Sequence, residues 1–145
     1  MAEQVSERIH IDAPPARTYE VATDFERYPD WAKDVKQADV LERDAEGRGA
    51  QVEYRAAAFG RSARYVLQYD YSQAPDAFSW TLVEGEMVRT IDGTYRFDPD
   101  GDGTRVSYDL AIDPSIPLPG FLKRRTAGMI VSTALKELKK AVESS

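Results

Sequence analysis

The sequence lacks cysteine, has a single histidine and contains no long apolar run. Without cysteine the chain can form no disulfide, no thiolate metal site and no cysteine nucleophile. The single histidine, His10, also excludes a Ser–His–Asp set and a histidine-based metal site. No segment approaches the roughly 20 apolar residues that span a bilayer, and no signal peptide is evident. We therefore expect a cytoplasmic protein with no metal, no cofactor and no integral membrane segment.

A surplus of positive charge is also missing, because the formal net charge is −6. Lysine and arginine are interspersed with aspartate and glutamate rather than grouped in blocks. Proteins that bind nucleic acid need a positive surface for the phosphates, so we expect no nucleic-acid partner. A chain of this length typically forms one domain and buries about 70% of its unfolded surface. We therefore expect a single domain over residues 1–145, large enough for a core or for a core with a cavity.

Alternating polarity predicts a series of β-strands that begins near the N-terminus. Residues 5–11 place mainly apolar side chains on one face and polar ones on the other, which is typical of a strand with one buried side. Asp12 is placed to cap a short helix that starts at Pro14 and Pro15, and a second short helix ends or kinks at Pro29. Six further strand-like runs follow, separated by Gly, Pro and Asp turns: residues 35–44, 50–58, 62–71, 77–84, 87–97 and 104–113.

The C-terminal part has a helical period instead. From about Leu118 onward, apolar side chains recur at helical spacing with Lys and Glu opposite: Ala127, Ile130, Val131, Ala134, Leu138 and Ala141. A helix of this length, about 35 Å, can cross a whole sheet. The order of elements predicts an α+β fold, with a seven-stranded antiparallel sheet, two short helices after the first strand and a long closing helix.

The sheet face that alternation predicts to be buried is rich in tyrosine and tryptophan. Such side chains carry a polar tip that needs a partner when it is buried, whereas the long helix presents small residues, Ala127, Ala134 and Ala141. Large polar-tipped side chains on the sheet and small ones on the helix leave space between the two layers. A ligand cavity and a filled core whose hydroxyls reach solvent at the margin are both compatible with this pattern.

One short segment, residues 24–35, has the sequence DFERYPDWAKDV. Phe25, Tyr28 and Trp31 stand three residues apart, which directs them to one side of a helical turn. The segment lies between the first strand and the remaining sheet. Its aromatic side chains are therefore either a plug that seals the core or a mouth that a ligand passes.

Two patterns stand out in this sequence: Asp24, Tyr28, Pro29 and Trp31 in the aromatic segment, and GTRVSY over residues 103–108. With them, nearly the whole chain resembles the START-like, or helix-grip, superfamily (SRPBCC), and in particular its polyketide cyclase/dehydrase and coenzyme-Q-binding branch. The resemblance implies a seven-stranded sheet curled around the long C-terminal helix, with a hydrophobic cavity between them.

With a cavity implied, we predict that its ligand contacts side chains from the aromatic segment, the sheet and the long helix: Tyr28, Trp31, Tyr54, Tyr65, Leu67, Trp80, Leu82, Tyr95, Ala127, Ile130 and Ala134. The expected ligand is a hydrophobic small molecule such as a lipid, a quinone or a polyketide. No macromolecular partner is identified by the pattern, although the coenzyme-Q-like branch also includes a ribosome-associating toxin.

Candidates for catalysis are few. Glu84 continues the inward-facing series Phe78, Trp80 and Leu82 and would have a raised pKa if buried; as a strand-end residue it could equally be solvated. Arg124, on the closing helix, could neutralise an anionic ligand or extend into solvent. The alternative function is therefore a polyketide aromatase/cyclase or dehydratase that uses Tyr, Arg and Glu side chains of the cavity.

An aspartate-rich segment, residues 98–109, fits the ligand spacing of an EF-hand in part. EF-hand loops lie between helices, but the residues on both sides of this segment alternate as strands. We therefore predict a β-hairpin turn at this position and no metal site.

Overall fold

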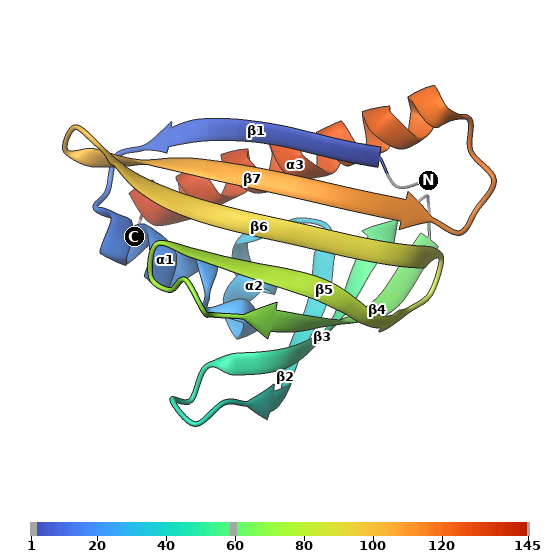
Figure 1. Ribbon diagram of the computed structural model, residues 1–145, viewed down its shortest axis with the longest axis horizontal. Coiled ribbons are helices and arrows are strands. Elements are labelled where there is room, and N and C mark those ends of the chain that lie inside the picture. The colour runs from blue at the N-terminus through green and yellow to red at the C-terminus, as the bar shows by residue number, and fades with distance from the viewer. Residues whose placement is uncertain (1–2, 59–60, 145) are drawn as a thin grey trace.

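The computed structural model describes residues 3–58 and 61–144, which form a sheet, three α-helices and one short 3-10 helix (Figure 1). The elements follow in this order: β1 (Glu3–Ile11), α1 (Pro15–Ala22), η1 (Phe25–Arg27), α2 (Tyr28–Trp31), β2 (Val35–Arg43), β3 (Gly49–Ala58), β4 (Arg61–Asp70), β5 (Ala77–Gly85), β6 (Val88–Asp100), β7 (Gly103–Pro114) and α3 (Gly120–Glu143). The α+β order predicted from the sequence is confirmed.

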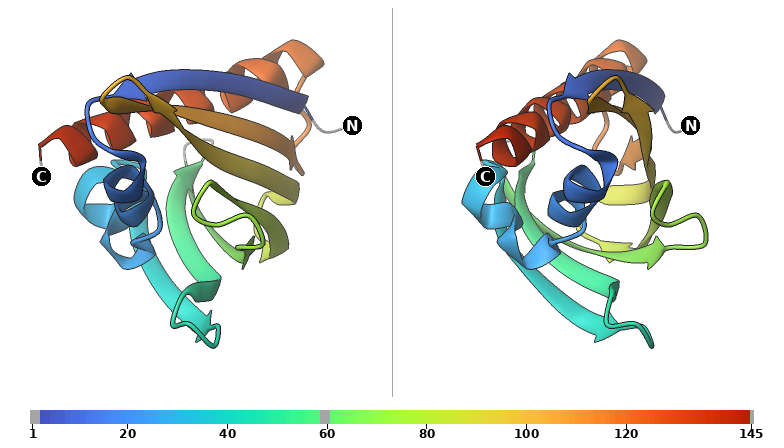
Figure 2. Two further views of the ribbon diagram at one scale, coloured as in Figure 1. Left: turned by 60° about the vertical axis from the view of Figure 1, so that its left-hand side comes forward. Right: turned by 90° about the vertical axis from the view of Figure 1, so that its left-hand side faces the viewer.

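The seven strands form one antiparallel sheet in the order β1-β7-β6-β5-β4-β3-β2. Strands β2 to β7 form a meander, since each of them pairs with the next strand in the sequence, and β1 adds to the far edge beside β7, where Ile9 pairs with Val106. The sheet curls strongly, so that β1 and β2 come to lie on either side of α3 (Figure 2). This curl forms a concave face along the helix.

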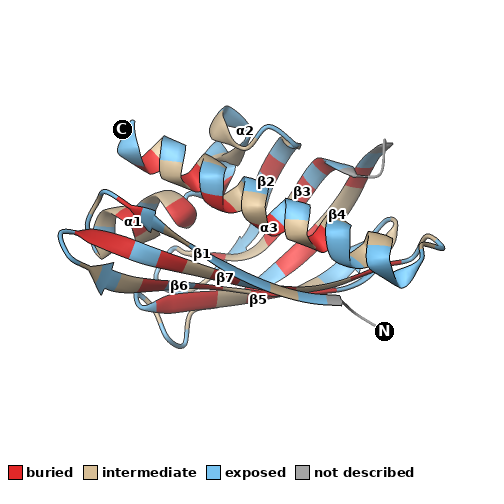
Figure 3. Ribbon diagram, turned by 90° about the horizontal axis from the view of Figure 1, so that it is seen from above, coloured by how far each residue is buried: buried red, intermediate tan, exposed pale blue. Residues whose placement is uncertain are grey.

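Helix α3 crosses the open side of the sheet over 24 residues, a length of about 36 Å. It buries one face, formed by Ala127, Val131, Leu135, Leu138 and Val142, whose spacing of three and four residues is the helical period predicted from the sequence. Figure 3 shows buried segments recurring along α3. Among the described residues, no helix combines the length and hydropathy of a membrane span.

The β6–β7 turn is a hairpin, as predicted for the aspartate-rich segment. Asp100 pairs with Gly103 across the turn, and Gly101 adopts a φ of +63°, which glycine tolerates without steric cost. Long strands precede and follow the turn, so the helix–loop–helix arrangement of an EF-hand is excluded at these residues.

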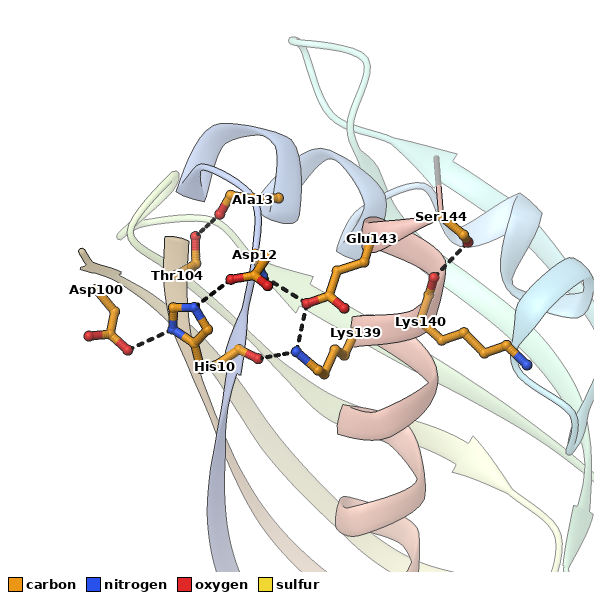
Figure 4. A network of polar contacts seen from close by, with 9 residues as sticks. All are labelled: His10, Asp12, Ala13, Asp100, Thr104, Lys139, Lys140, Glu143 and Ser144. Carbon is orange, nitrogen blue, oxygen red and sulfur yellow. Dashed lines mark hydrogen bonds and ion pairs between the residues drawn. The ribbon is translucent and has the colours of Figure 1, made fainter. Parts of the chain in front are cut away.

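The expected capping role of Asp12 is wrong. Helix α1 has Pro14 at its N-cap position and no side-chain cap. Asp12 Oδ1 lies instead 2.9 Å from Nε2 of His10, and the opposite ring nitrogen of His10 lies 2.8 Å from Asp100. Lys139 of α3 donates to the His10 carbonyl oxygen. Figure 4 shows how these contacts join β1, the β6–β7 turn and the end of α3 at one corner of the molecule.

Candidate ligand-binding cavity

A cavity of about 510 Å³ lies between α3 and the concave face of the sheet. Its wall is dominated by aromatic side chains from the aromatic segment and from strands β3 to β7: Tyr28, Trp31, Tyr54, Tyr65, Tyr69, Trp80, Tyr95 and Tyr108. Helix α3 contributes Thr126, Met129, Ile130, Thr133, Ala134 and Glu137. Of the three small helix residues expected to leave this space, Ala134 lines the cavity, whereas Ala127 and Ala141 do not.

Nine of the eleven side chains predicted to contact a ligand lie on this wall: Tyr28, Trp31, Tyr54, Tyr65, Leu67, Trp80, Tyr95, Ile130 and Ala134. Leu82 is half-buried against the core without reaching the wall. Ala127 is fully buried on the face of α3 that also carries Val131. These two side chains therefore do not line the cavity; for Ala127 the reason is that helical spacing alone does not distinguish the packed face from the neighbouring cavity face.

Glu84 also lies away from the cavity, and a β-bulge is the reason. Leu67 pairs with Leu82, whereas Val66 pairs with Glu84, so Val83 is an extra residue in β5. An extra residue inverts the alternation beyond it, and Gly85 rather than Glu84 stands opposite Tyr65. The Glu84 side chain is 61% exposed and forms an ion pair with Arg64 at 3.2 Å. Of the two alternatives considered for Glu84, the structure therefore shows the solvated strand-end carboxylate and not the buried acid.

Arg124 is exposed near the start of α3 and is not among the side chains that line the cavity. Neither of the two charged residues considered for catalysis thus reaches the enclosed space. The alternation of the strands could have identified further wall residues, since Tyr69, Tyr108, Leu110 and Ile112 lie on the predicted inward face. Nothing in the sequence pattern indicated Asp34, Glu86 or Glu137, which come from turns and from α3.

The aromatic segment supplies both a plug and part of the cavity wall. Phe25 is 2% exposed and stacks on Tyr69 with ring centroids 4.3 Å apart, so it seals the core beneath α1. Tyr28 donates its hydroxyl proton to the carbonyl oxygen of Ala22. Trp31 packs against Tyr28 at 4.9 Å, is half-buried and lines the cavity. The interpretation of this segment as a plug therefore fits Phe25, whereas Trp31 is part of the cavity wall.

The tyrosine hydroxyls divide into a paired and an unpaired group. Tyr54 and Tyr69 share a hydrogen bond of 2.6 Å. Among the described residues, the hydroxyls of Tyr65, Tyr95 and Tyr108 have no hydrogen-bond partner. In the same part of the chain, every side-chain polar atom that is fully shielded from solvent does have a partner. These three hydroxyls therefore face the open space of the cavity, where a ligand could hydrogen-bond to them.

Burial keeps these tyrosines neutral. It raises the pKa of Tyr28, Tyr54, Tyr69 and Tyr108 well above the ordinary value and raises the pKa of Tyr65 to about 12. Burial also raises the pKa of Tyr95, and the carboxylate of Glu137 raises it further. The hydroxyls can therefore donate or accept hydrogen bonds, but they do not act as anionic bases near neutral pH.

Comparison with known proteins places the chain in a family. A model of the polyketide cyclase / dehydrase and lipid transport family matches residues 2–143. A comparison with curated protein sequences finds no significant match. Among solved structures, a START superfamily protein from Mycobacterium smegmatis superposes with a TM-score of 0.92 at 25% identity, over 97% of each chain.

Two other structures support the same fold. A protein from Thermus thermophilus superposes with a TM-score of 0.82 at 28% identity, over 98% of each chain. The Zhui aromatase/cyclase from a Streptomyces species reaches a TM-score of 0.82 at 16% identity, over 99% of this chain and 94% of the other. The resemblance to the START-like superfamily is thereby confirmed, and the chain belongs to the polyketide cyclase/dehydrase and lipid transport family.

Proposed function

We propose that this protein binds a hydrophobic small molecule in the cavity between α3 and the sheet. The observation that carries the proposal is the partly open cavity of about 510 Å³, whose wall is mainly aromatic and aliphatic. This volume is within the usual range for small-molecule sites, roughly 300–1,000 Å³. The family of the chain, which includes lipid transport, supports the same function.

Catalysis as a polyketide aromatase/cyclase or dehydratase is the alternative. Such a reaction needs groups that stabilise an enolate or move a proton. Glu84 and Arg124, the residues predicted to carry such a reaction, do not line the cavity. The polar groups on the wall include neutral tyrosine hydroxyls and the carboxylates of Asp34, Glu86 and Glu137, without a lysine, arginine or histidine among the described lining residues. Binding without chemical change is therefore the better supported proposal.

Native mass spectrometry tests the proposal directly. The purified protein is incubated with a panel of uncharged quinones, long-chain alcohols and polycyclic aromatics. We expect a one-to-one adduct whose ligand mass is unchanged. A product that has lost water would favour the dehydratase alternative, and the absence of any adduct would contradict the proposal.

A variant that fills the cavity provides the specific control. Ala134 lines the wall on α3, so the indole of Ala134→Trp would enter the space that the ligand needs. Lys136 lies on the exposed side of the same helix, and Lys136→Trp adds the same side chain outside the cavity. We expect the first substitution to abolish the adduct and the second to leave it, with circular dichroism confirming that both variants are folded.

A further inference from the structure

The charged side chains on the cavity wall all have the same sign. The wall includes the carboxylates of Asp34, Glu86 and Glu137 and, within the part of the chain that the structure describes, no lysine, arginine or histidine. An anionic headgroup would therefore meet like charges and no positive partner, which is unfavourable in a partly desolvated space. A fatty acid is a poor match for such a wall.

Glu137 is the carboxylate best placed to meet a ligand. It is half-buried on α3, and its Oε2 accepts a hydrogen bond of 3.1 Å from the Lys33 amide. Within the described residues this amide is its only donor, which leaves acceptor capacity toward the cavity. Glu86, by contrast, is exposed, and its Oε1 already accepts from the Arg64 amide at 2.8 Å.

An independent observation comes from two tyrosines on the same cavity wall. Tyr95 and Tyr108 are each only 7% exposed, their ring centroids are 4.6 Å apart, and neither hydroxyl has a partner among the described residues. Glu137 is close enough for its charge to raise the pKa of Tyr95. Since no fully buried side-chain polar atom of the described residues lacks a partner, both hydroxyls open onto the cavity, where a polar group of a ligand can hydrogen-bond to them.

A protonated amine satisfies this arrangement. An ammonium group has only donors, and it could donate to the Glu137 carboxylate and to the oxygens of Tyr95 and Tyr108. Aromatic faces such as that of Trp31 also attract cations, with an effect that grows when the cation is desolvated. A neutral ligand gains the hydroxyl contacts but nothing from the carboxylate.

We propose that the ligand of this cavity is a lipophilic amine, with the protonated nitrogen beside Glu137, Tyr95 and Tyr108 and the apolar body among the aromatic rings. This inference rests on the proposed function, since it specifies the charge of the molecule that the same cavity binds. The inference and the proposed function can be tested separately. A cavity that binds neutral molecules as tightly as amines would agree with the proposed function and contradict the inference.

Three ligands of one shape and different charge test the proposal: 2-(1-naphthyl)ethylamine, 2-(1-naphthyl)ethanol and 1-naphthylacetic acid, measured by isothermal titration calorimetry at neutral pH. We expect the amine to bind about tenfold tighter than the alcohol, and the acid to bind weaker than the alcohol by a similar factor. Added salt should reduce the preference for the amine, because the preference is electrostatic.

Glu137→Gln removes the charge and keeps an amide oxygen that can accept from Lys33. It should weaken the amine about tenfold and leave the affinity for the alcohol within about twofold. Glu84→Gln makes the same chemical change outside the cavity and should alter neither affinity. Equal binding of amine and alcohol, tighter binding of the acid, or an amine preference that survives in Glu137→Gln would overturn the inference and leave the proposed function standing. No binding of any of the three would count against both.

Discussion

Trp80 occupies the space that a side chain at position 93 would need. The two residues pair directly between β5 and β6, and a Cβ atom added to Gly93 would lie 2.2 Å from Cε2 of the indole. Since Trp80 is buried and lines the cavity, a methyl group here would displace its ring toward the ligand space.

Gly93→Ala should therefore destabilise the protein by about 1–3 kcal/mol, the usual cost of overpacking a core. Urea denaturation measures this change, and the displaced ring should also weaken ligand binding. The matched control is Gly128→Ala in α3, where an added Cβ meets nothing within 4 Å. That variant should be unchanged or more stable by up to about 1 kcal/mol, because alanine favours the helix. Equal stability of both variants would contradict the close approach of Trp80 to Gly93.

At the scale of secondary-structure elements, the aromatic segment combines a ring that seals the core, Phe25, with a ring on the cavity wall, Trp31. Phe25→Ala removes a ring that is buried and stacked on Tyr69, so we expect a loss of about 3–5 kcal/mol in the free energy of unfolding. Trp31→Ala removes a half-buried ring on the cavity wall, and its main effect should be on ligand affinity.

Urea denaturation and native mass spectrometry, applied to both variants, separate these effects. The expected pattern is a large stability loss with Phe25→Ala and a smaller one, with a weakened adduct, for Trp31→Ala. The opposite pattern would mean that Trp31 is the structural plug of this segment.

The corner that joins β1 to the β6–β7 turn depends on His10. Hydrogen bonds to Asp100 and then to Asp12 raise the pKa of His10 above its ordinary value of 6.5. The folded state therefore retains the proton to a higher pH than the unfolded chain. The stabilisation from these contacts is fully present below pH 6.5 and is lost as the pH rises through the folded pKa.

NMR titration of the imidazole is unambiguous because the chain has one histidine. We expect a pKa above 6.5 in the native protein and a lower value in Asp100→Asn, which loses the larger of the two hydrogen-bond effects. Asp102→Asn, in the same turn and exposed, is the control and should change the pKa little. A wild-type value at or below 6.5 would exclude these contacts in solution.

At the scale of the whole molecule, the tyrosine-rich interior predicts how stability responds to alkali. Unfolded tyrosines ionise near pH 10, whereas burial raises the pKa of Tyr65 to about 12 and raises that of Tyr54, Tyr69 and Tyr108 as well. Above pH 10 the unfolded chain therefore binds fewer protons than the folded protein. The free energy of unfolding should fall as the pH rises from 10 to 12 for this reason.

Urea denaturation at successive pH values, together with the ultraviolet absorbance of tyrosinate, measures both quantities. Most tyrosines should titrate only as the protein unfolds. If the absorbance change were complete near pH 10 while the protein stayed folded, the tyrosines would be exposed to water and the enclosed cavity would be excluded.

Much of this molecule was predictable from local pattern. Alternation in the six runs between residues 35 and 113 matches β2 to β7 to within a few residues, because each strand has one buried face and side chains alternate with period two. The apolar repeat that includes Ala127 and Val131 likewise predicted α3. The aromatic character of the cavity wall followed from the same alternation, since the inward positions of neighbouring strands meet on one concave face.

The order of the elements, the fold and the aromatic wall therefore follow from local sequence patterns, because these features depend on periodicities that each segment carries alone. The outward direction of Glu84 depends instead on tertiary pairing, since the bulge at Val83 arises from how β5 pairs with β4. The tertiary structure also decided that Glu137, Asp34 and Glu86 lie on the cavity wall. They come from a helix and two turns that share no periodicity, and only the curl of the sheet around α3 places them along one enclosed space.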